Sequence, residues 1–336
     1  MINTVGQYPN IRMRRLRTKG WIREMVQEHR LHVSDLILPL FVEENLDERV
    51  AVSSLPGVFR ETEDSVVTAV KDAYALGIPA VMLFGVSHNK DATGSNALSE
   101  RGLLHRMIDR VKQAVPEIGV IADVCFCEYT NHGHCGPLDK HGGVDNDATL
   151  EGLAAQSVIA AKAGADIIAP SGMMDGMIQA IRSGLDQDGF PDIPLLSYAA
   201  KYASAFYGPF RDAAGCSLDS AQNGVARDRK AYQMNPANAD EAMREVALDI
   251  AEGVDMVMVK PGLPYLDIIN RIKEIYKMPT FAYHVSGEFA MLKAAAVNGW
   301  LDYDIALHEM ILSFKRAGCD GILTYGALDL AKSLSA

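Results

Sequence analysis

The sequence predicts an α/β fold of one kind, a (β/α)8 TIM barrel with an extended N-terminal arm. Eight short apolar runs alternate with eight longer amphipathic segments, which is typical of parallel strands covered by helices. Eight such units in 336 residues favour a closed barrel that forms one domain. An open doubly wound sheet is the second choice, because LFVEENLDER stands where that fold needs a glycine-rich phosphate-binding turn.

The expected strands are short, rich in β-branched residues and apolar on both faces. They lie at residues 36–42, 80–86, 119–126, 166–171, 194–202, 255–261, 280–286 and 321–327. The expected helices lie at residues 62–75, 98–114, 149–163, 173–184, 239–252, 265–276, 288–298 and 304–317. Several helical segments end at a glycine, the residue that most readily takes the left-handed conformation at a helix C-terminus. These glycines are Gly77, Gly164, Gly253 and Gly318.

Residues 1–30 precede the first strand and contain the basic stretch IRMRRLRTKG. No apolar core follows this stretch, so a secretory signal is not expected. A targeting peptide and a nucleic-acid-binding arm are alternatives. We favour an arm that packs on a neighbouring subunit, with residues 31–336 forming the barrel domain.

The charge balance and the cysteines argue against several classes of protein. Thirty-two basic and 43 acidic residues give a net charge of -11, which disfavours broad binding to nucleic acid or to anionic membranes. No apolar run approaches the ~18 residues of a membrane span. The five cysteines are odd in number and three lie within eleven residues, which does not fit a secreted disulfide framework. We therefore expect a cytoplasmic protein.

The segment DVCFCEYTNHGHCG carries the strongest chemical signal. Alternation along a strand places Asp123, Cys125 and Cys127 on one face, and Cys135 follows eight residues later. Three thiolates form a soft site suited to zinc, with a fourth position open for water or substrate. The alternatives are two buried cysteines with a third nearby by chance, and a structural zinc site, which would usually have four ligands.

Two lysines close neighbouring expected strands, Lys201 the fifth and Lys260 the sixth. In a barrel, both side chains would point into the mouth. A desolvated lysine beside another cation has a lowered pKa, and its neutral amine can attack a ketone to form an imine. Either lysine alone would by default be a surface residue. The two together favour a catalytic site.

The longest interruption of the pattern, at about residues 203–237, follows the fifth strand. A loop of this length is usually functional or disordered, and in a barrel it would lie on the catalytic face, so we expect a lid. An arginine of this lid could bind a substrate carboxylate through two hydrogen bonds. The candidates are Arg211, Arg227 and Arg229. Ser286 and Tyr325, at the ends of the last two expected strands, could donate hydrogen bonds to a second carboxylate.

Several blocks of the sequence resemble the signature blocks of the porphobilinogen synthase family, also called 5-aminolevulinate dehydratase. These blocks are KYASAFYGPFRDA, DRKAYQMNPAN, DMVMVKPGLPYLDII, VSGEFAML and GILTY, and similarity runs from about residue 8 to the C-terminus. DVCFCEYTNHGHCG is similar to the zinc-type metal loop of the family, whereas magnesium-only members carry aspartates there. The resemblance implies a hydro-lyase of heme biosynthesis that condenses two molecules of 5-aminolevulinate to porphobilinogen with loss of two waters.

The resemblance also implies a role for each matching residue. Lys260 would form a Schiff base with the A-side substrate and Lys201 with the P-side substrate, with Asp123 near the zinc and the reacting amine. The A-side carboxylate would be held by Arg211, Arg229 and Gln233. The P-side carboxylate would be held by Ser286 and Tyr325, with Tyr207 and Phe210 as pocket walls.

The resemblance extends to metals and assembly. The zinc ligands would be Cys125, Cys127 and Cys135, and Glu245 matches the position that binds an allosteric magnesium in many bacterial members. A homo-octamer is implied, with the N-terminal arm embracing the barrel of a neighbour. The stretch between Arg211 and Arg229 is longer than in the commonest family pattern, so Arg227 could compete with Arg229 for the carboxylate.

Two other functions fit part of this pattern. A class I aldolase is also a Schiff-base barrel, but it needs one such lysine and no three-cysteine loop. A catalytically inert barrel that stores zinc or binds partners would show zinc without turnover.

Overall fold

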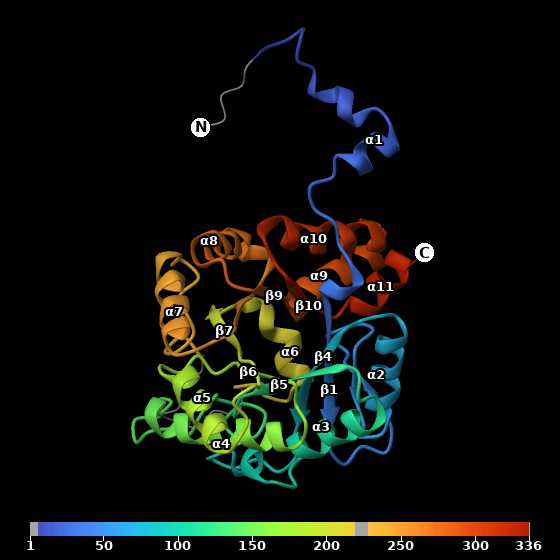
Figure 1. Ribbon diagram of the computed structural model, residues 1–336. Coiled ribbons are helices and arrows are strands. Elements are labelled where there is room, and N and C mark those ends of the chain that lie inside the picture. Colours follow the sequence, from blue (N-terminus) through green and yellow to red (C-terminus); the bar gives the residue numbers. More distant parts are fainter. Residues whose placement is uncertain (1–5, 219–227, 336) are drawn as a thin grey trace.

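Eight parallel strands form a barrel in the part of the chain that the computed structural model describes, residues 6–218 and 228–335 (Figure 1). In chain order they are β1 (Leu36–Glu43), β4 (Ala80–Val86), β5 (Gly119–Val124), β6 (Ile167–Pro170), β7 (Leu196–Lys201), β8 (Met256–Lys260), β9 (Thr280–His284) and β10 (Gly321–Thr324). Their order in the sheet is β6-β5-β4-β1-β10-β9-β8-β7. A bridge between Ile168 and Leu195 closes the barrel between β6 and β7. The predicted barrel is therefore confirmed.

The strands are buried on both faces, as parallel strands under helices require. All eight residues of β1 are buried. Aromatic rings fill the barrel interior, where Phe210 lies 5.5 Å from Phe41 and 5.2 Å from Phe84, measured between ring centroids. The strands are apolar on both faces because the core lies both inside the barrel and beneath its helices.

Helices cover the outside of the barrel, one after nearly every strand (Figure 1). They are α2 (Ser65–Ala75), α3 (Leu103–Ala114), α4 (Asn146–Lys162), α5 (Met177–Gln187), α7 (Asp240–Ala251), α8 (Leu266–Tyr276), α9 (Ser286–Val297) and α10 (Tyr303–Ala317). The helix-ending glycines have φ angles from 81° at Gly77 to 111° at Gly318. A side chain other than glycine would be strained at these angles.

Several elements differ from the sequence-based expectation. A short hairpin, β2 (Val50–Ala51) and β3 (Phe59–Glu61), extends the sheet beside β1. A last helix, α11 (Ala327–Ser335), buries Ala327, Leu330 and Ala331. Strand β9 ends at His284, so Ser286 begins α9 instead of closing a strand. These elements are too short or too mixed in composition for periodicity to mark them.

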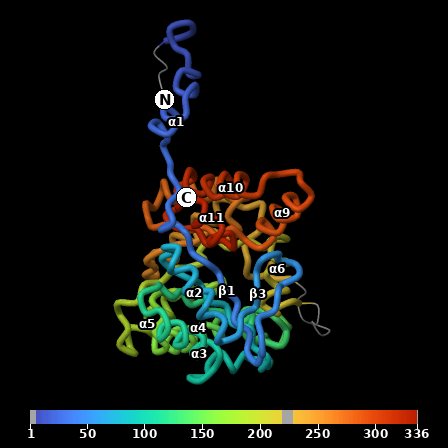
Figure 2. The backbone as a smooth tube through the Cα atoms, turned by 90° about the vertical axis from the view of Figure 1, so that its right-hand side faces the viewer, coloured from blue at the N-terminus to red at the C-terminus, as the bar shows by residue number. Residues whose placement is uncertain are grey.

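Residues 6–30 extend away from the barrel, as both views show (Figures 1 and 2). They contain the 3-10 turn η1 (Met13–Arg17) and the short helix α1 (Gly20–Met25), and neither element has a buried residue. Tyr8 and Trp21 are among the exposed apolar side chains of this segment. Packing of this arm on a neighbouring subunit remains a prediction.

The segment expected to be a lid, residues 203–237, is described only in part. It begins with the 3-10 turn η4 (Ala205–Tyr207) and the helix α6 (Gly208–Ala213), which pack against α9. Residues 219–227, which include Arg227, lie outside the described residues. Among the described residues, no helix is long and apolar enough to cross a membrane.

The packing of α9 on η4 leads to a prediction about Gly287. A Cβ at Gly287 would lie 2.6 Å from the carbonyl oxygen of Phe206 and 2.7 Å from its Cα. Gly287→Ala should therefore destabilise the fold by roughly 1–3 kcal/mol through overpacking. This exceeds the gain of up to about 1 kcal/mol in helix propensity. Urea unfolding of the purified variant measures the difference.

Gly208→Ala is the matched control. Gly208 begins α6 with a φ of −49°, and its added Cβ would meet no atom within 4 Å. Its stability should stay the same or rise slightly. If Gly287→Ala were as stable as Gly208→Ala, then α9 and η4 could move apart without a loss in the free energy of unfolding.

Candidate active site

Two lysines lie side by side at the ends of neighbouring strands. Lys201 ends β7 and Lys260 ends β8, and the two residues are partners in the register of the strand pair. Their side chains are only 5% and 4% exposed. The Nζ of Lys201 donates a hydrogen bond to the carbonyl oxygen of Ser171 at 2.6 Å. The structure therefore brings the two sequence-predicted amines together in the barrel mouth.

Aromatic rings surround the amine of Lys260. Its Nζ lies 4.4 Å from the ring centroid of Tyr283, 4.7 Å from Phe210 and 5.0 Å from Tyr198. Burial, reinforced by the charge of Lys201, lowers the pKa of Lys260 to about 7. At neutral pH a large fraction of this amine is therefore uncharged and able to act as a nucleophile.

Asp123 supplies a carboxyl group beside the two amines. It lies near the end of β5, is 7% exposed, and accepts a hydrogen bond from the Ser171 hydroxyl at 3.2 Å. Burial raises the pKa of Asp123 to about 6, although the charges of Lys260 and Lys201 act in the opposite direction. Its Oδ1 has no hydrogen-bond partner among the residues that the structure describes. A carboxyl group with this pKa can accept and return a proton near neutral pH.

Three cysteine sulfurs converge next to the lysines. The Sγ atoms of Cys125, Cys127 and Cys135 all lie within 4.8 Å of one another, and all three residues are buried. Strand β5 ends at Val124, so Cys125 and Cys127 lie in the turn after the strand and not on the strand face that alternation predicted. Among the described residues this is the one group of three or more potential metal ligands that converges so closely.

The thiol chemistry of this cluster fits a soft divalent cation. Hydrogen bonds to Cys125, Cys135 and Cys216, together with burial, raise the pKa of Cys127 well above its usual range. Three thiols packed this closely ionise together only when a cation offsets their charge. A tetrahedral ion bound by three thiolates keeps one coordination position for another ligand.

Sequence reasoning missed two groups that touch the cluster. The carboxylate of Glu128 lies 3.2 Å from the Cys127 sulfur, and burial raises the pKa of Glu128 to about 8. The thiol of Cys216 hydrogen-bonds with Cys127 and with the Arg229 guanidinium. Glu128 could have been noted as the neighbour of a predicted ligand. Cys216 follows α6, far along the chain, and no spacing rule connects it with the metal loop.

Three side chains predicted to bind a carboxylate line one cavity. Arg211, Arg229 and Gln233 all border it. The Nη2 of Arg229 donates to the carbonyl oxygens of Gly133 at 2.7 Å and Cys216 at 3.0 Å. The buried Nε atoms of both arginines and both amide atoms of Gln233 have no partner in the described residues. Buried polar atoms without partners indicate a place where a polar ligand binds.

The remaining predicted binding residues come from α9, from the end of β10 and from the segment after β7. Ser286 is fully buried at the start of α9, and its hydroxyl accepts a hydrogen bond from the Phe210 amide at 2.9 Å. The hydroxyl of Tyr325 lies 2.8 Å from that of Tyr283. Tyr207 donates to the carbonyl oxygen of Lys260 at 3.0 Å. Tyr207 and Phe210 line a small cavity together with both lysines and Cys127.

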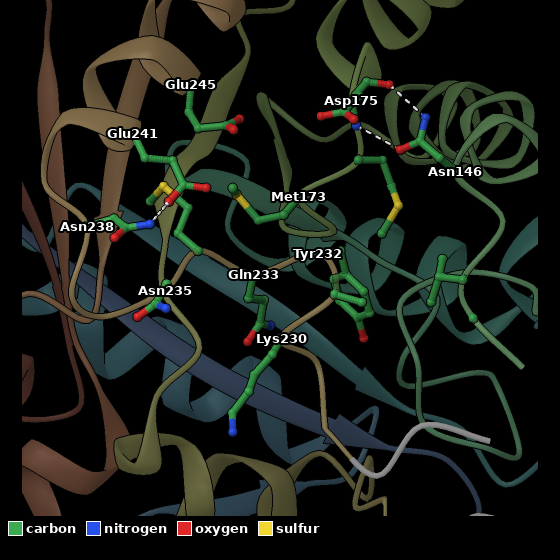
Figure 3. A pocket seen from close by; sticks show the side chains of 15 residues that line it. Asn146, Met173, Asp175, Lys230, Tyr232, Gln233, Asn235, Asn238, Glu241 and Glu245 are labelled. Atoms are coloured by element: carbon green, nitrogen blue, oxygen red, sulfur yellow. Dashed lines mark hydrogen bonds between the residues drawn. The ribbon is translucent and has the colours of Figure 1, made fainter. Parts of the chain in front are cut away.

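Glu245 lies on α7 and lines a different pocket, which Gln233 also borders. Figure 3 shows its carboxylate near those of Glu241 and Asp175, and the three line the same pocket. Burial and the negative charges of Asp175 and Glu241 raise the pKa of Glu245. Asp175 is fixed by Asn146, whose side chain accepts from the Asp175 amide at 2.8 Å. The carboxylates do not converge as a metal-ligand set among the described residues.

The chain is similar to proteins of one known family. The chain matches the family described as delta-aminolevulinic acid dehydratase over residues 10–333. A delta-aminolevulinic acid dehydratase of Synechocystis is 53% identical over 330 residues, which cover 97% of this chain and 99% of the relative. One from Escherichia coli is 52% identical over 321 residues, covering 96% of this chain and 97% of the relative.

A solved structure is also similar. It is the delta-aminolevulinic acid dehydratase (porphobilinogen synthase) of Toxoplasma gondii ME49 in complex with the reaction product porphobilinogen. Its TM-score is 0.92 at 43% sequence identity, and the match covers 96% of this chain and 91% of that chain.

The pairing of the two lysines leads to a prediction about amine reactivity. In the unaltered chain, competitive acetylation of Lys260 should titrate with a midpoint near pH 7. Lys201→Met removes a neighbouring positive charge, so the midpoint should rise by about one pH unit. Mass spectrometry of the labelled peptide measures it. Lys71→Met, on the exposed side of α2, should leave the midpoint unchanged. An unchanged midpoint in Lys201→Met would show that desolvation alone sets the reactivity.

Proposed function

The chain belongs to the delta-aminolevulinic acid dehydratase family, and we propose that it condenses two molecules of 5-aminolevulinate to porphobilinogen through Schiff bases on two lysines. The reaction releases two waters, is a hydro-lyase reaction and belongs to heme biosynthesis. The observation that carries the proposal is the pair of buried amines in register, beside a three-cysteine cluster. A class I aldolase would need neither the second amine nor the cysteines.

Lys260 and Lys201 each form an imine with the ketone of one substrate. The neutral amine attacks the carbonyl carbon, and water leaves as the C=N bond forms. The imine makes the carbonyl carbon more electrophilic and the adjacent carbon more acidic, which serves the C–N and the C–C bond. Lys260 serves the A-side substrate and Lys201 the P-side substrate. Asp123, beside both amines, accepts and returns protons during these steps.

The two carboxylates bind on opposite sides of the lysines. Arg211, Arg229 and Gln233 hold the A-side carboxylate, which their buried unpartnered atoms support. Ser286 and Tyr325 hold the P-side carboxylate, where the amino end of α9 adds the positive end of its helix dipole. Tyr207 and Phe210 exclude water from the lysines, which strengthens every charge interaction in the site.

The family is metal-dependent, and we assign zinc to Cys125, Cys127 and Cys135. The softness of the three sulfurs and their mutual distances support this choice. When bound there, zinc supplies a Lewis acid and a local positive charge beside the reacting amines. Glu245, with Asp175 and Glu241 across its pocket, is proposed as an allosteric magnesium site completed by water or by another subunit.

We propose that the chain acts as a cytoplasmic homo-octamer. The five cysteines are free of disulfides, which suits a reducing compartment. Residues 1–30 serve as the arm that embraces a neighbouring barrel. The exposed apolar side chains of this arm, such as Trp21 at 60%, support the assignment. Residues 203–237 serve as the lid of the site.

Zinc removal tests the reaction and the metal together. The purified chain should convert 5-aminolevulinate to a pyrrole detected with Ehrlich's reagent. Turnover should vanish after chelation and return when zinc is restored, because the three thiolates hold the ion that the reaction needs. Full turnover after verified zinc removal would leave the reaction but reject zinc at the cysteines. A folded protein that forms no pyrrole in any state would reject the proposed reaction.

Removal of the arm tests the assembly. A chain lacking residues 1–28 should fold into a barrel, because the described part of this segment buries nothing in η1 or α1. It should form smaller and less active assemblies than the full chain, as measured by light scattering and specific activity. An arm-less chain that remains a fully active octamer would contradict the proposed role.

A further inference from the structure

The metal loop has a fourth cysteine beside it that the proposed mechanism does not use. Cys216 is 1% exposed and hydrogen-bonds through its thiol with Cys127. The same thiol faces the guanidinium of Arg229. Cys216 therefore belongs to the buried thiol cluster, although its sulfur lies outside the tightest set of Cys125, Cys127 and Cys135.

The backbone around Cys216 is fixed by contacts from three other segments. The Nζ of Lys90 donates to the carbonyl oxygen of Gly215 at 2.5 Å. Arg229 donates to the carbonyl oxygen of Cys216 at 3.0 Å and ties it to the carbonyl oxygen of Gly133 in the metal loop. The Cys216 amide donates to the carbonyl oxygen of Arg211 at 3.1 Å. These bonds fix the backbone at Cys216 against the metal loop, so its sulfur can approach the other three only by rotation of its side chain.

Gly133 lets the two segments approach this closely. A Cβ at Gly133 would lie 2.8 Å from the carbonyl oxygen of Ser217 and 3.1 Å from that of Cys216. The φ of Gly133 is also positive, at 72°. Any larger residue would therefore push Cys216 away from the cysteine cluster. The metal loop and the segment after α6 fit together only because this position carries no side chain.

We infer that Cys216 is a fourth, exchangeable thiolate ligand of the metal that Cys125, Cys127 and Cys135 hold. The inference rests on the proposed metal site. A rotation of the Cys216 side chain brings a fourth sulfur to the ion, and four thiolates complete a closed tetrahedral site. The resting chain then holds its metal tightly. A substrate that enters the cavity replaces the Cys216 sulfur and opens the site.

The chemistry of the donors favours Cys216 over Glu128 for this position. Both groups contact Cys127, but a carboxylate oxygen is a hard ligand and the other three donors are soft. Cys216 is also carried by a separate segment of the chain, so it can leave without moving the other three cysteines. Glu128 follows Cys127 directly in the chain, so it cannot move away as independently.

Cobalt(II) reports the number of thiolate ligands directly. The full-length chain and Cys216→Ser are loaded with one cobalt per chain, and the sulfur-to-cobalt charge-transfer absorption is measured. Loss of one of four thiolates should lower this absorption by about a quarter. Zinc affinity, measured by competition with a chromophoric chelator, should fall at least about tenfold, a loss that even outer-shell partners produce. Cys319→Ser is the matched control, because Cys319 is buried between α10 and β10, apart from the cluster.

A second measurement needs no substitution. Levulinate, the substrate without its amino group, is titrated into the cobalt-loaded full chain. If substrate displaces Cys216, saturation should lower the charge-transfer absorption of the full chain by about a quarter. This titration tests the fourth ligand even where Cys216→Ser folds poorly.

The outcomes separate the inference from the proposed function. Equal absorption and zinc affinity in Cys216→Ser and the full chain, with no response to levulinate, would overturn the fourth ligand and leave the three-cysteine site intact. The same holds if Glu128→Gln, and not Cys216→Ser, changes the spectrum. A full chain that takes up no cobalt, or a Cys127→Ser variant that binds it unchanged, would reject the metal site itself.

Discussion

The site depends on two amines that the fold holds side by side. Lys201 and Lys260 are register partners on β7 and β8, so neither can move away from the other without breaking the strand pair. Burial removes water from both amines, and their mutual repulsion makes a doubly protonated pair costly. The nearby carboxyl of Asp123 partly compensates. A neutral amine at neutral pH is therefore a property of the strand pairing.

The surroundings of Lys260 balance two opposing effects. Four aromatic rings, those of Tyr198, Tyr207, Phe210 and Tyr283, face its amine within 5.4 Å. Their π faces favour the charged form, while the dry cavity that they build favours the neutral form. With its pKa held near 7, the amine can be both protonated and nucleophilic at one pH. Such a group can take part in imine formation and in the proton transfers that surround it.

The sequence predicts the barrel well, because each buried parallel strand must be apolar on both faces and each helix must follow its strand. It also predicts that Lys201 and Lys260 end neighbouring strands and that the three cysteines come together, although Cys125 and Cys127 lie just beyond the strand that alternation assigns them to. It predicts less where contacts join distant segments. Cys216 approaches the metal loop through Gly133 and Arg229, and no periodicity records that contact. The sequence pattern assigns Ser286 to a strand end, but α9 begins there. Helix α9 follows β9 almost directly, so no loop marks the boundary between them.

The N-terminal segment has a thermodynamic consequence for the whole chain. Between residues 6 and 30, nearly every side chain is exposed, so ordering this segment gains almost no burial from its own barrel. Fixing a residue's backbone costs about 1–2 kcal/mol of conformational entropy, which burial normally offsets. In the proposed assembly, the compensation comes from the neighbouring barrel that this segment contacts. Because that barrel belongs to another chain, mass action makes the order of the segment depend on protein concentration. Dilution then disorders this segment while the barrel stays folded.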